Sequence, residues 1–591
     1  MRAMSLDSAA SQQKAPLHNP TATVQVIGSR WAVAAGHPLA SEAAAAILSA
    51  GGNAIDAGVA AGLCLGVVHP DMVSVAGVAP ILVHVAGAGE TWQVSGVGPY
   101  PRASTLAYFS ERGNEIPVGL PRTVVPAAPA AWCTALERWG TMSFGDVAAA
   151  ATEHAERGFP LSSFSGFLMS TNADKYRRWA SSTALYLRDG RPYGIGDRLV
   201  QSELGETLRR MARAEAHAGG AREVGIRAAR DEFYRGETAK RIAEFHRREG
   251  GPLTYADLGA FAVEVAPALR TTFGAYEVAA CGFWCQGPVL LQMLNLLDGV
   301  DLRALGHNSP AYLHRIVETV KVAFADRDAF YADPNVVKIP AQELLSKEYA
   351  AARRGLIRDR AWTEMPPAGD LGAVRPHARQ AVAIAGGSFD GPDGGGALDT
   401  SYVAVVDQHG NGFSATPSDP NVDSPVVEGV GCVVSPRGSQ GWLDPAHPSV
   451  VAPGKRPRLT PAPAMAFAEG GRLMMPFGTP GGDVQQQAML QVFLNHVVFG
   501  MELQRAVEAP RVASRSFPDS FWPHVYAPGK LEVEARIPHE TREALAEMGH
   551  DVTVWPDWEW RAGAVCGVRV AADGARWAGA DPRRGSHAIA R

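Results

Sequence analysis

A threonine, Thr400, stands at the border between two segments of opposite character. Residues 385–399 contain the glycine-rich run GGSFDGPDGGGALD, and residues 402–406 form the β-branched and aromatic run YVAVV. Dense glycine has no side chain to bury and loses much backbone entropy on ordering, so the first run is predicted to be a flexible leash. The second run predicts a strand. A chain that cleaves itself before Thr400 would free an α-amine that can act as general base for the Thr400 hydroxyl.

The local pattern also fits a plainer interpretation. Residues 408–411 (QHGN) are typical of a turn and residues 413–416 (FSAT) of a returning strand, so an ordinary linker that enters a β-hairpin would look the same. Threonine is common at the start of strands. Both interpretations stay open on this segment alone.

A second chemical feature is the glycine pair Gly481-Gly482. It follows the apolar run 473–477 and precedes a helical pattern at 488–493, which predicts a strand, a tight turn and a helix start. Two backbone N–H groups at such a turn, together with the helix N-terminus, can stabilise a developing oxyanion. The alternative is a plain glycine turn. Ser418 lies among prolines in TPSDP, where a serine is most often a turn former.

Motifs for other chemistries are missing from the sequence. No phosphate-binding loop, HExxH zinc motif, nucleophile elbow or complete GxGxxG motif occurs. Cys281 and Cys285 are four residues apart, but no second Cys or His cluster completes a metal set. The histidines, His314 on a helix face among them, are predicted to be packing or surface residues. We therefore expect neither a cofactor nor a metal, and reduced cysteines in the core.

Composition indicates a large globular protein. The 591 residues are 46% hydrophobic with a formal net charge of −5, and the densest basic cluster, KRPR at 455–458, is too short to argue for nucleic acid. The N-terminus lacks the apolar core of a signal peptide, and no stretch is apolar enough to span a membrane. These features predict a cytoplasmic protein that binds neither nucleic acid nor membrane.

Patterning predicts a mixed α/β protein in one intertwined unit. The expected elements are helices at 41–50, capped by Ser41, and at 53–65, a strand at 81–85, a helical region at 288–360 with one amphipathic helix over 311–329, and strands at 552–555 and 565–570.

Several long strings make the chain resemble the γ-glutamyltransferase family of N-terminal-nucleophile (Ntn) hydrolases from about Ala34 to Arg584. They are GHPLASEAAAAILSAGGNAIDAGVAA, HRIVETVKVAFADRDAFYADP, DTSYVAVVDQHGNGFSAT, FGTPGGDVQQQAMLQVF and GADPRR. The resemblance implies a four-layer αββα sandwich built by two chains from one precursor. The implied parts are a flexible N-terminus (1–30), a large subunit (31–399, with the leash at 385–399) and a small subunit (400–591).

The same resemblance implies roles for individual residues. Thr400 falls on the family's processed nucleophile, Ser418 on a hydroxyl that helps to hold the nucleophile's amine, and Gly481 and Gly482 on the pair whose N–H groups stabilise the oxyanion. Cleavage is expected between Asp399 and Thr400.

The substrate contacts depart from the family's pattern. The uncharged residues 95–97 stand where an arginine binds the α-carboxylate of glutamyl substrates, and residues 433–441 contain no acid where an aspartate binds the α-amine. A supporting serine pair is replaced near Leu459 and Thr460. Without charged partners, a zwitterionic headgroup loses several kcal/mol of charge-assisted hydrogen bonding. The remaining candidates for binding a substrate carboxylate, beside Thr460, are Arg102, Arg456 and Arg458.

The sequence therefore predicts a self-processing amidohydrolase that acts on a small amide of oxamate-like or glutaryl-like type, as in the branch of oxamate amidohydrolases and cephalosporin-acylase-like proteins. One alternative is a true γ-glutamyltransferase or glutathione hydrolase with displaced contacts. Another is a non-catalytic relative that is never processed and acts as a binding protein. Further association of the paired subunits is left open.

Overall fold

A computed structural model describes residues 22–371 and 399–591 of the chain. Residues 1–21 and residues 385–398 of the predicted leash lie outside the described residues. Within the stretch 1–30, predicted as flexible, residues 26–28 form strand β1 (Val26–Gly28), which pairs with β22 (Arg576–Gly579). Regular structure thus begins before the predicted boundary at residue 31.

Within the described residues, two seven-stranded antiparallel sheets form the centre of the molecule. The first sheet has the order β1, β22, β21 (Cys566–Val570), β17 (Leu473–Gly478), β16 (Ala464–Phe467), β11 (Tyr276–Ala280) and β10 (Leu269–Phe273). The second has the order β23 (His587–Ala590), β2 (Ala32–Ala35), β12 (Val403–Val406), β13 (Gly412–Ala415), β3 (Ile81–Val85), β4 (Glu90–Val94) and β9 (Val265–Pro267).

The sheets pack face to face, and the alternation of side chains along β12 shows how. Val403 and Val405 belong to the core cluster that the second sheet shares with its covering helices, whereas Ala404 and Val406 belong to the cluster between the two sheets. Because successive residues of a strand point to opposite faces, an unbroken apolar strand is what two buried faces require.

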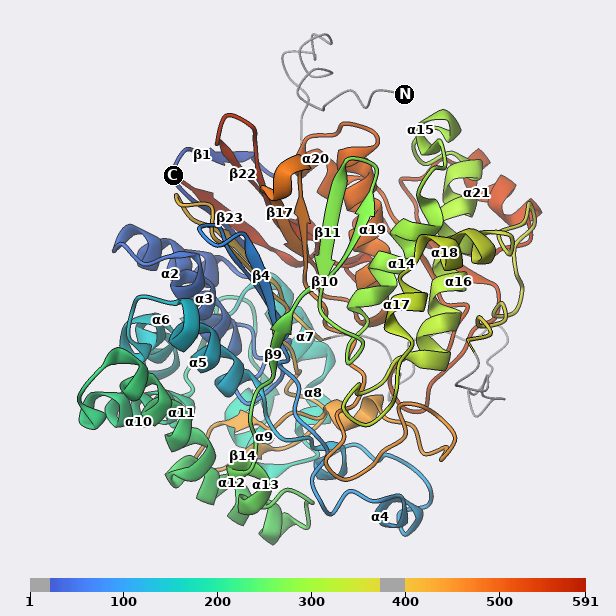
Figure 1. Cartoon of the computed structure of the whole chain (residues 1–591). Helices are drawn as coiled ribbons and strands as arrows, with labels where there is room; N and C mark the ends of the chain where they lie inside the picture. Colours follow the sequence, from blue (N-terminus) through green and yellow to red (C-terminus); the bar gives the residue numbers. More distant parts are fainter. Residues whose placement is uncertain (1–21, 372–398) are drawn as a thin grey trace.

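Helices cover the outer face of each sheet (Figure 1). The second sheet is covered by α2 (Pro38–Ser49), α3 (Ala54–Val68) and α5 (Ala128–Trp139), and the first by α14 (Gly287–Leu297), α19 (Gln485–Val497) and α20 (Leu503–Glu508). Helices α16 (Pro310–Phe330), α18 (Lys347–Arg354) and α21 (His539–Glu547) lie farther out on that side. The predicted mixed α/β fold is confirmed, with its layers in the order helix, sheet, sheet, helix.

The remaining elements flank these layers. A helical lobe between β4 and β9 contains α6 (Phe144–Arg157), α7 (Ser163–Thr171), α8 (Ala173–Tyr176), α9 (Ala180–Tyr186), α10 (Ser202–Ala218), α11 (Arg222–Arg235), α12 (Glu237–Glu249) and α13 (Tyr255–Gly259). A small sheet joins β18 (Val512–Ser514), β19 (Lys530–Glu534) and β20 (Asp551–Trp555). In the described ranges, no helix combines the length and the apolarity that a membrane crossing needs.

The predicted start of the first helix was wrong. Helix α2 begins at Pro38 and is capped by His37, whose Nδ1 accepts a hydrogen bond from the Leu39 N–H at 3.3 Å. Proline suits the first turn because an N–H at that position has no acceptor within the helix, so no hydrogen bond is lost. Ser41 lies inside the helix and donates its hydroxyl hydrogen to the His587 carbonyl oxygen, 2.9 Å away.

Candidate active site

Thr400 and the glycine turn lie at the same edge of the two packed sheets. Thr400 comes shortly before β12, and Gly478 ends β17 in the facing sheet. A Cβ atom added to Gly478 would lie 2.3 Å from the ring of Tyr402, so only glycine permits this close approach. The contact brings the start of β12 beside the turn that contains Gly481.

The backbone of Thr400 is strained. The chain is unbroken here, and Thr400 has a φ of 88°, a conformation that a β-branched residue rarely adopts. Its N–H donates to the Met72 carbonyl oxygen at 3.0 Å. A conformation of this kind costs about 1–3 kcal/mol and is found mostly at functional sites. The strained torsion is that of the N–Cα bond of Thr400, directly after the peptide bond that joins Asp399 to Thr400.

The hydroxyl of Thr400 is part of a buried hydrogen-bond relay. Its Oγ1 lies 2.8 Å from Ser418 Oγ and donates to Asp399 Oδ1 at 3.2 Å. Arg437 Nη2 donates both to Ser418 Oγ and to Asp399 Oδ2. Since Ser418 accepts from Arg437, its own hydrogen can go to Thr400, and the hydrogen of Thr400 then points at the Asp399 carboxylate.

Arg437 organises this relay, and sequence analysis missed it. Its side chain is 1% exposed, its Nε donates to Asp419 Oδ1 at 2.5 Å, and its Nη1 lies 3.4 Å from Thr460 Oγ1. Burial lowers the pKa of Arg437, but the carboxylates of Asp399 and Asp419 outweigh burial and raise that pKa above its usual value. Arg437 lies within 433–441, the stretch in which the family's pattern has an acid. The partner acid, Asp419, follows Ser418 directly in the sequence.

The glycine pair presents unused hydrogen-bond donors. Neither Gly481 nor Gly482 donates its N–H to another described residue, and both have positive φ values, 126° and 55°. Gln286 Nε2 donates to the Gly482 carbonyl oxygen at 2.9 Å and thereby helps to fix the turn. The one-turn segment Gly482–Val484 leads directly into α19, whose N-terminus adds positive potential.

Two buried charged side chains near Met72, those of Arg584 and Asp71, have polar atoms without a hydrogen bond to the described residues. Arg584 Nε donates to the Trp560 carbonyl oxygen at 2.9 Å and its Nη1 approaches Met72 Sδ at 3.8 Å. Its Nη2 has no hydrogen-bond partner among the described residues and lies 3.9 Å from the position of a Cβ on Gly481. Burial lowers the pKa of Arg584 to about 10. Neither carboxylate oxygen of Asp71 makes a hydrogen bond within the described residues, and burial raises its pKa to about 6. Unsatisfied buried groups of this kind are typical of a site that receives a ligand or water.

Two of the predicted substrate-binding arginines lie in another place. Arg102 and Arg456 line a cavity of about 390 Å³ whose wall includes Ser95 and Val97 but none of Thr400, Ser418 and the glycine pair. Arg456 pairs with Asp333 at 2.6 Å and with Glu264 at 3.0 Å. The side chain of Arg102 is 71% exposed. The structure therefore does not bring these two arginines together with Thr400.

The other two predicted contacts, Thr460 and Arg458, do not line that cavity. Thr460 Oγ1 accepts from Gln440 Nε2 at 2.9 Å and faces Arg437, so Thr460 belongs to the same network. Arg458 is 1% exposed and donates to Ser520 Oγ at 3.3 Å. Burial lowers the pKa of Arg458 to about 9.

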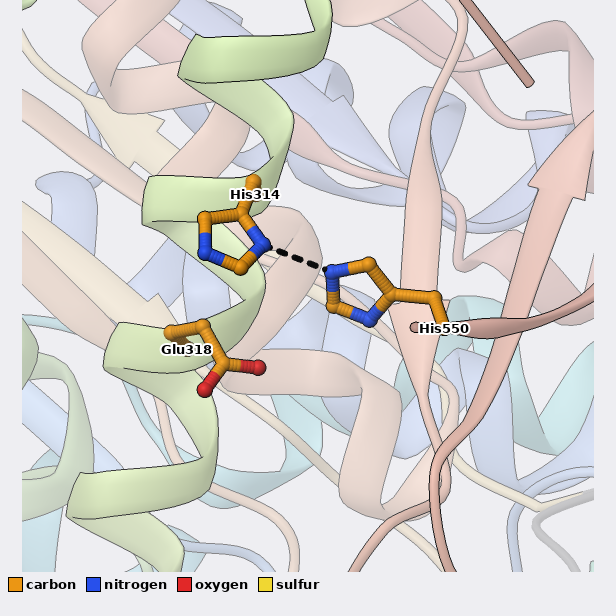
Figure 2. A group of neighbouring side chains, drawn as sticks. All are labelled: His314, Glu318 and His550. Atoms are coloured by element: carbon orange, nitrogen blue, oxygen red, sulfur yellow. Dashed lines mark hydrogen bonds between the residues drawn. The ribbon is translucent and has the colours of Figure 1, made fainter. Parts of the chain in front are cut away.

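A separate buried group has the residue types of a metal site (Figure 2). His314 Nε2 must donate to the Arg358 carbonyl oxygen at 2.7 Å, so its Nδ1 accepts from His550 Nε2 at 2.9 Å. Glu318 is paired with the buried ammonium of Lys321 at 2.7 Å. The nitrogens that face each other and the carboxylate are thus already engaged, and we assign the group to packing between α16 and the start of β20.

The family described as Gamma-glutamyltranspeptidase matches residues 40–591. Acylase ACY 1 proenzyme of Pseudomonas sp. (strain V22) is 32% identical, with 90% of this chain and 88% of the relative covered. The glutathione hydrolase-like YwrD proenzyme of Bacillus subtilis (strain 168) is 30% identical over 95% of this chain and 99% of its own length. The crystal structure of cephalosporin acylase from Bacillus halodurans superposes with a TM-score of 0.83 at 26% identity, over 98% of this chain and 99% of that one.

Proposed function

The chain belongs to the gamma-glutamyltranspeptidase family, whose relatives named above include proenzyme hydrolases, and we propose that it is a self-processing Ntn amidohydrolase with Thr400 as nucleophile. The observation that carries the proposal is the strained Thr400, with its hydroxyl 2.8 Å from Ser418 and directed at the Asp399 carboxylate. A linker threonine at the start of a hairpin would need none of these features.

Maturation begins in the unbroken chain, where the nitrogen of Thr400 is an amide and cannot act as a base. The Asp399 carboxylate takes the hydroxyl proton while Thr400 Oγ1 attacks the carbonyl carbon of Asp399. The C–N bond breaks, the proton passes to the leaving amine, and an ester joins Asp399 to Thr400 Oγ1. Water hydrolyses this ester, which restores the hydroxyl and leaves Asp399 with a terminal carboxylate.

The mature reaction uses the new amine. It accepts the proton of Thr400 Oγ1 as this oxygen attacks an amide carbonyl, and it then protonates the departing amine of the substrate. The free N–H groups of Gly481 and Gly482 hold the oxyanion, and Ser418 holds the nucleophile in place. As water attacks the ester, the amine takes a proton from the water and passes it to Thr400 Oγ1, which releases the acid and restores both the hydroxyl and the neutral amine.

Strand order explains why the two products stay together. In the second sheet, β2 lies between β23 and β12, and β13 lies beside β3, so strands from before and after residue 400 alternate. Separation of the large subunit (31–399) from the small subunit (400–591) would break the pairings of β23 with β2, β2 with β12 and β13 with β3, and it would expose the core between the sheets. We therefore propose that both subunits form one sandwich.

For the substrate, we propose a small acyl amide of oxamate-like or glutaryl-like type. The acylase relatives support an acyl group, and the uncharged residues 95–97 offer no cation at one of the positions expected for glutamyl recognition. Specificity constants for γ-glutamyl, glutaryl and oxalyl anilides, measured side by side, test this assignment. A tenfold preference for the γ-glutamyl compound, about 1.4 kcal/mol in transition-state binding, would favour the glutathione hydrolase alternative that the YwrD relative represents.

A further inference from the structure

Asp399, the residue before the proposed nucleophile, indicates which groups surround the acyl part of a substrate. In maturation and in turnover the same oxygen, Thr400 Oγ1, attacks a carbonyl carbon, and in maturation that carbon belongs to Asp399. The groups that hold the Asp399 side chain therefore surround the acyl half of the bond under attack. This inference rests on the proposed function.

An ion pair with Arg437 holds the side chain of Asp399. Its side chain is 4% exposed, and its Oδ2 accepts from Arg437 Nη2. The guanidinium spans two carboxylates, since its Nε donates to Asp419 Oδ1 at 2.5 Å. The Arg437 guanidinium is also fixed by its hydrogen bond to Ser418 Oγ and by the ring of Phe521, whose centroid lies 5.3 Å from Arg437 Cζ.

Turnover requires Asp399 to leave. A substrate carbonyl can reach Thr400 Oγ1 only where the carbonyl of Asp399 now lies, so the two acyl groups exclude each other. Once Asp399 withdraws, Arg437 keeps Asp419 and Ser418, but one N–H of its Nη2 loses its acceptor. A buried guanidinium N–H beside the nucleophile then has no partner, and a carboxylate is the acceptor that suits it best.

We propose that Arg437 binds a carboxylate of the acyl group, and that the substrates are monoamides of short dicarboxylic acids in which this carboxylate replaces that of Asp399. In Asp399, two carbons separate the carbonyl carbon from the carboxylate carbon. A succinyl group has the same spacing. The site thus selects a charged four-carbon acyl group over a neutral group of equal length.

The test compares two anilides that differ only in the terminal group, succinyl and butyryl. With the mature wild-type enzyme we expect a kcat/KM at least about tenfold higher for the succinyl compound. Arg437→Gln should lower both values, because Arg437 also holds Ser418, but it should lower the succinyl value at least about tenfold more than the butyryl value and so remove the preference. The matched control is Arg353→Gln, which removes another buried arginine, paired with Asp326 at 3.1 Å in the outer helices. It should keep the wild-type preference.

Loss of maturation in Arg437→Gln would prevent that comparison, so wild-type enzyme supplies a second measurement. Succinate should inhibit butyryl-anilide hydrolysis competitively, at a concentration at least about tenfold lower than butyrate requires. Equal inhibition by both acids, or equal hydrolysis of both anilides, overturns the carboxylate site and leaves the amidohydrolase intact. A wild-type chain that is never cleaved and hydrolyses neither anilide overturns the proposed function as well.

Discussion

Thr400 Oγ1 lies 2.8 Å from Ser418 Oγ, although the two residues belong to opposite arms of a hairpin. The backbone of Ser418 is fixed in position, because its N–H donates to the Val78 carbonyl oxygen at 2.9 Å. Pro417 is tied to the strand beside it, since its carbonyl oxygen accepts from Ser401 N–H at 2.9 Å. The two hydroxyls are therefore placed by backbone pairing rather than by flexible side chains, as a preorganised nucleophile requires.

The first prediction concerns the base for maturation. Asp399→Asn keeps the shape of the side chain but cannot accept a proton, so cleavage should slow by at least about tenfold. Pulse-chase labelling followed by denaturing gels measures the half-time of the full-length band. Thr400→Ser, which keeps a hydroxyl, is the positive control and should still mature. Unchanged kinetics in Asp399→Asn would show that another group takes the proton.

The second prediction concerns the glycine turn. Gly481→Ala has space, with Gly563 Cα 3.6 Å from the new Cβ, but φ of 126° strains any residue other than glycine. Relaxation of the turn should move the oxyanion donors and lower kcat by about 10- to 100-fold. Gly500→Ala is the matched control, because φ is 68° and no atom lies within 4 Å of its Cβ. Equal kcat values for the two variants would exclude a role of Gly481 in turnover.

The third prediction uses the pKa of Asp71, which burial raises to about 6 from an ordinary value near 3.8. His69 approaches it at 3.6 Å but is itself neutral, because burial lowers the His69 pKa to about 3. Between pH 3.8 and about pH 6, Asp71 is protonated more often in the folded chain than in the unfolded chain, so the folded state binds more protons. The free energy of unfolding therefore falls as the pH rises from about 4 to 6.

Asp71→Asn removes this loss. It should stabilise the chain by about 1–3 kcal/mol at pH 8 and give no advantage at pH 4. The measurement is the melting temperature across this pH range in a Thr400→Ala background, which keeps the chain unbroken. Asp557→Asn, at an exposed aspartate, should show no such trend. An Asp71→Asn advantage that is the same at pH 4 and pH 8 would contradict the ionisation account.

Local patterns in the sequence predicted much of the fold. The helix expected at 53–65 is α3, whose cap Asn53 accepts from the N–H groups of Ile55 and Asp56, and the helix expected at 311–329 is α16. The strand expected at 552–555 is β20. These elements have strong periodicity and caps, which act locally. The start of α2 was predicted wrongly because serine is a preferred N-cap and histidine is not. The sequence pattern therefore favoured Ser41 over His37 as the capping residue.

The sequence could point only to those candidate site residues that a local pattern marks. Thr400, Ser418 and the glycine pair sit at element borders that the pattern marks. Arg437 could not be recognised, because its meaning depends on Asp399 and Asp419, which reach it through tertiary contacts. Charge alone suggested Arg102 and Arg456 as substrate contacts, and only the structure shows that they line a cavity without Thr400.

Cleavage before Thr400 is the central claim, and intact mass spectrometry with N-terminal sequencing of the purified protein tests it most directly. We predict two chains that remain associated, the smaller of which begins at Thr400, and a single uncleaved chain for Thr400→Ala. A wild-type protein that stays in one piece, or a small chain that begins at any other residue, would contradict the account.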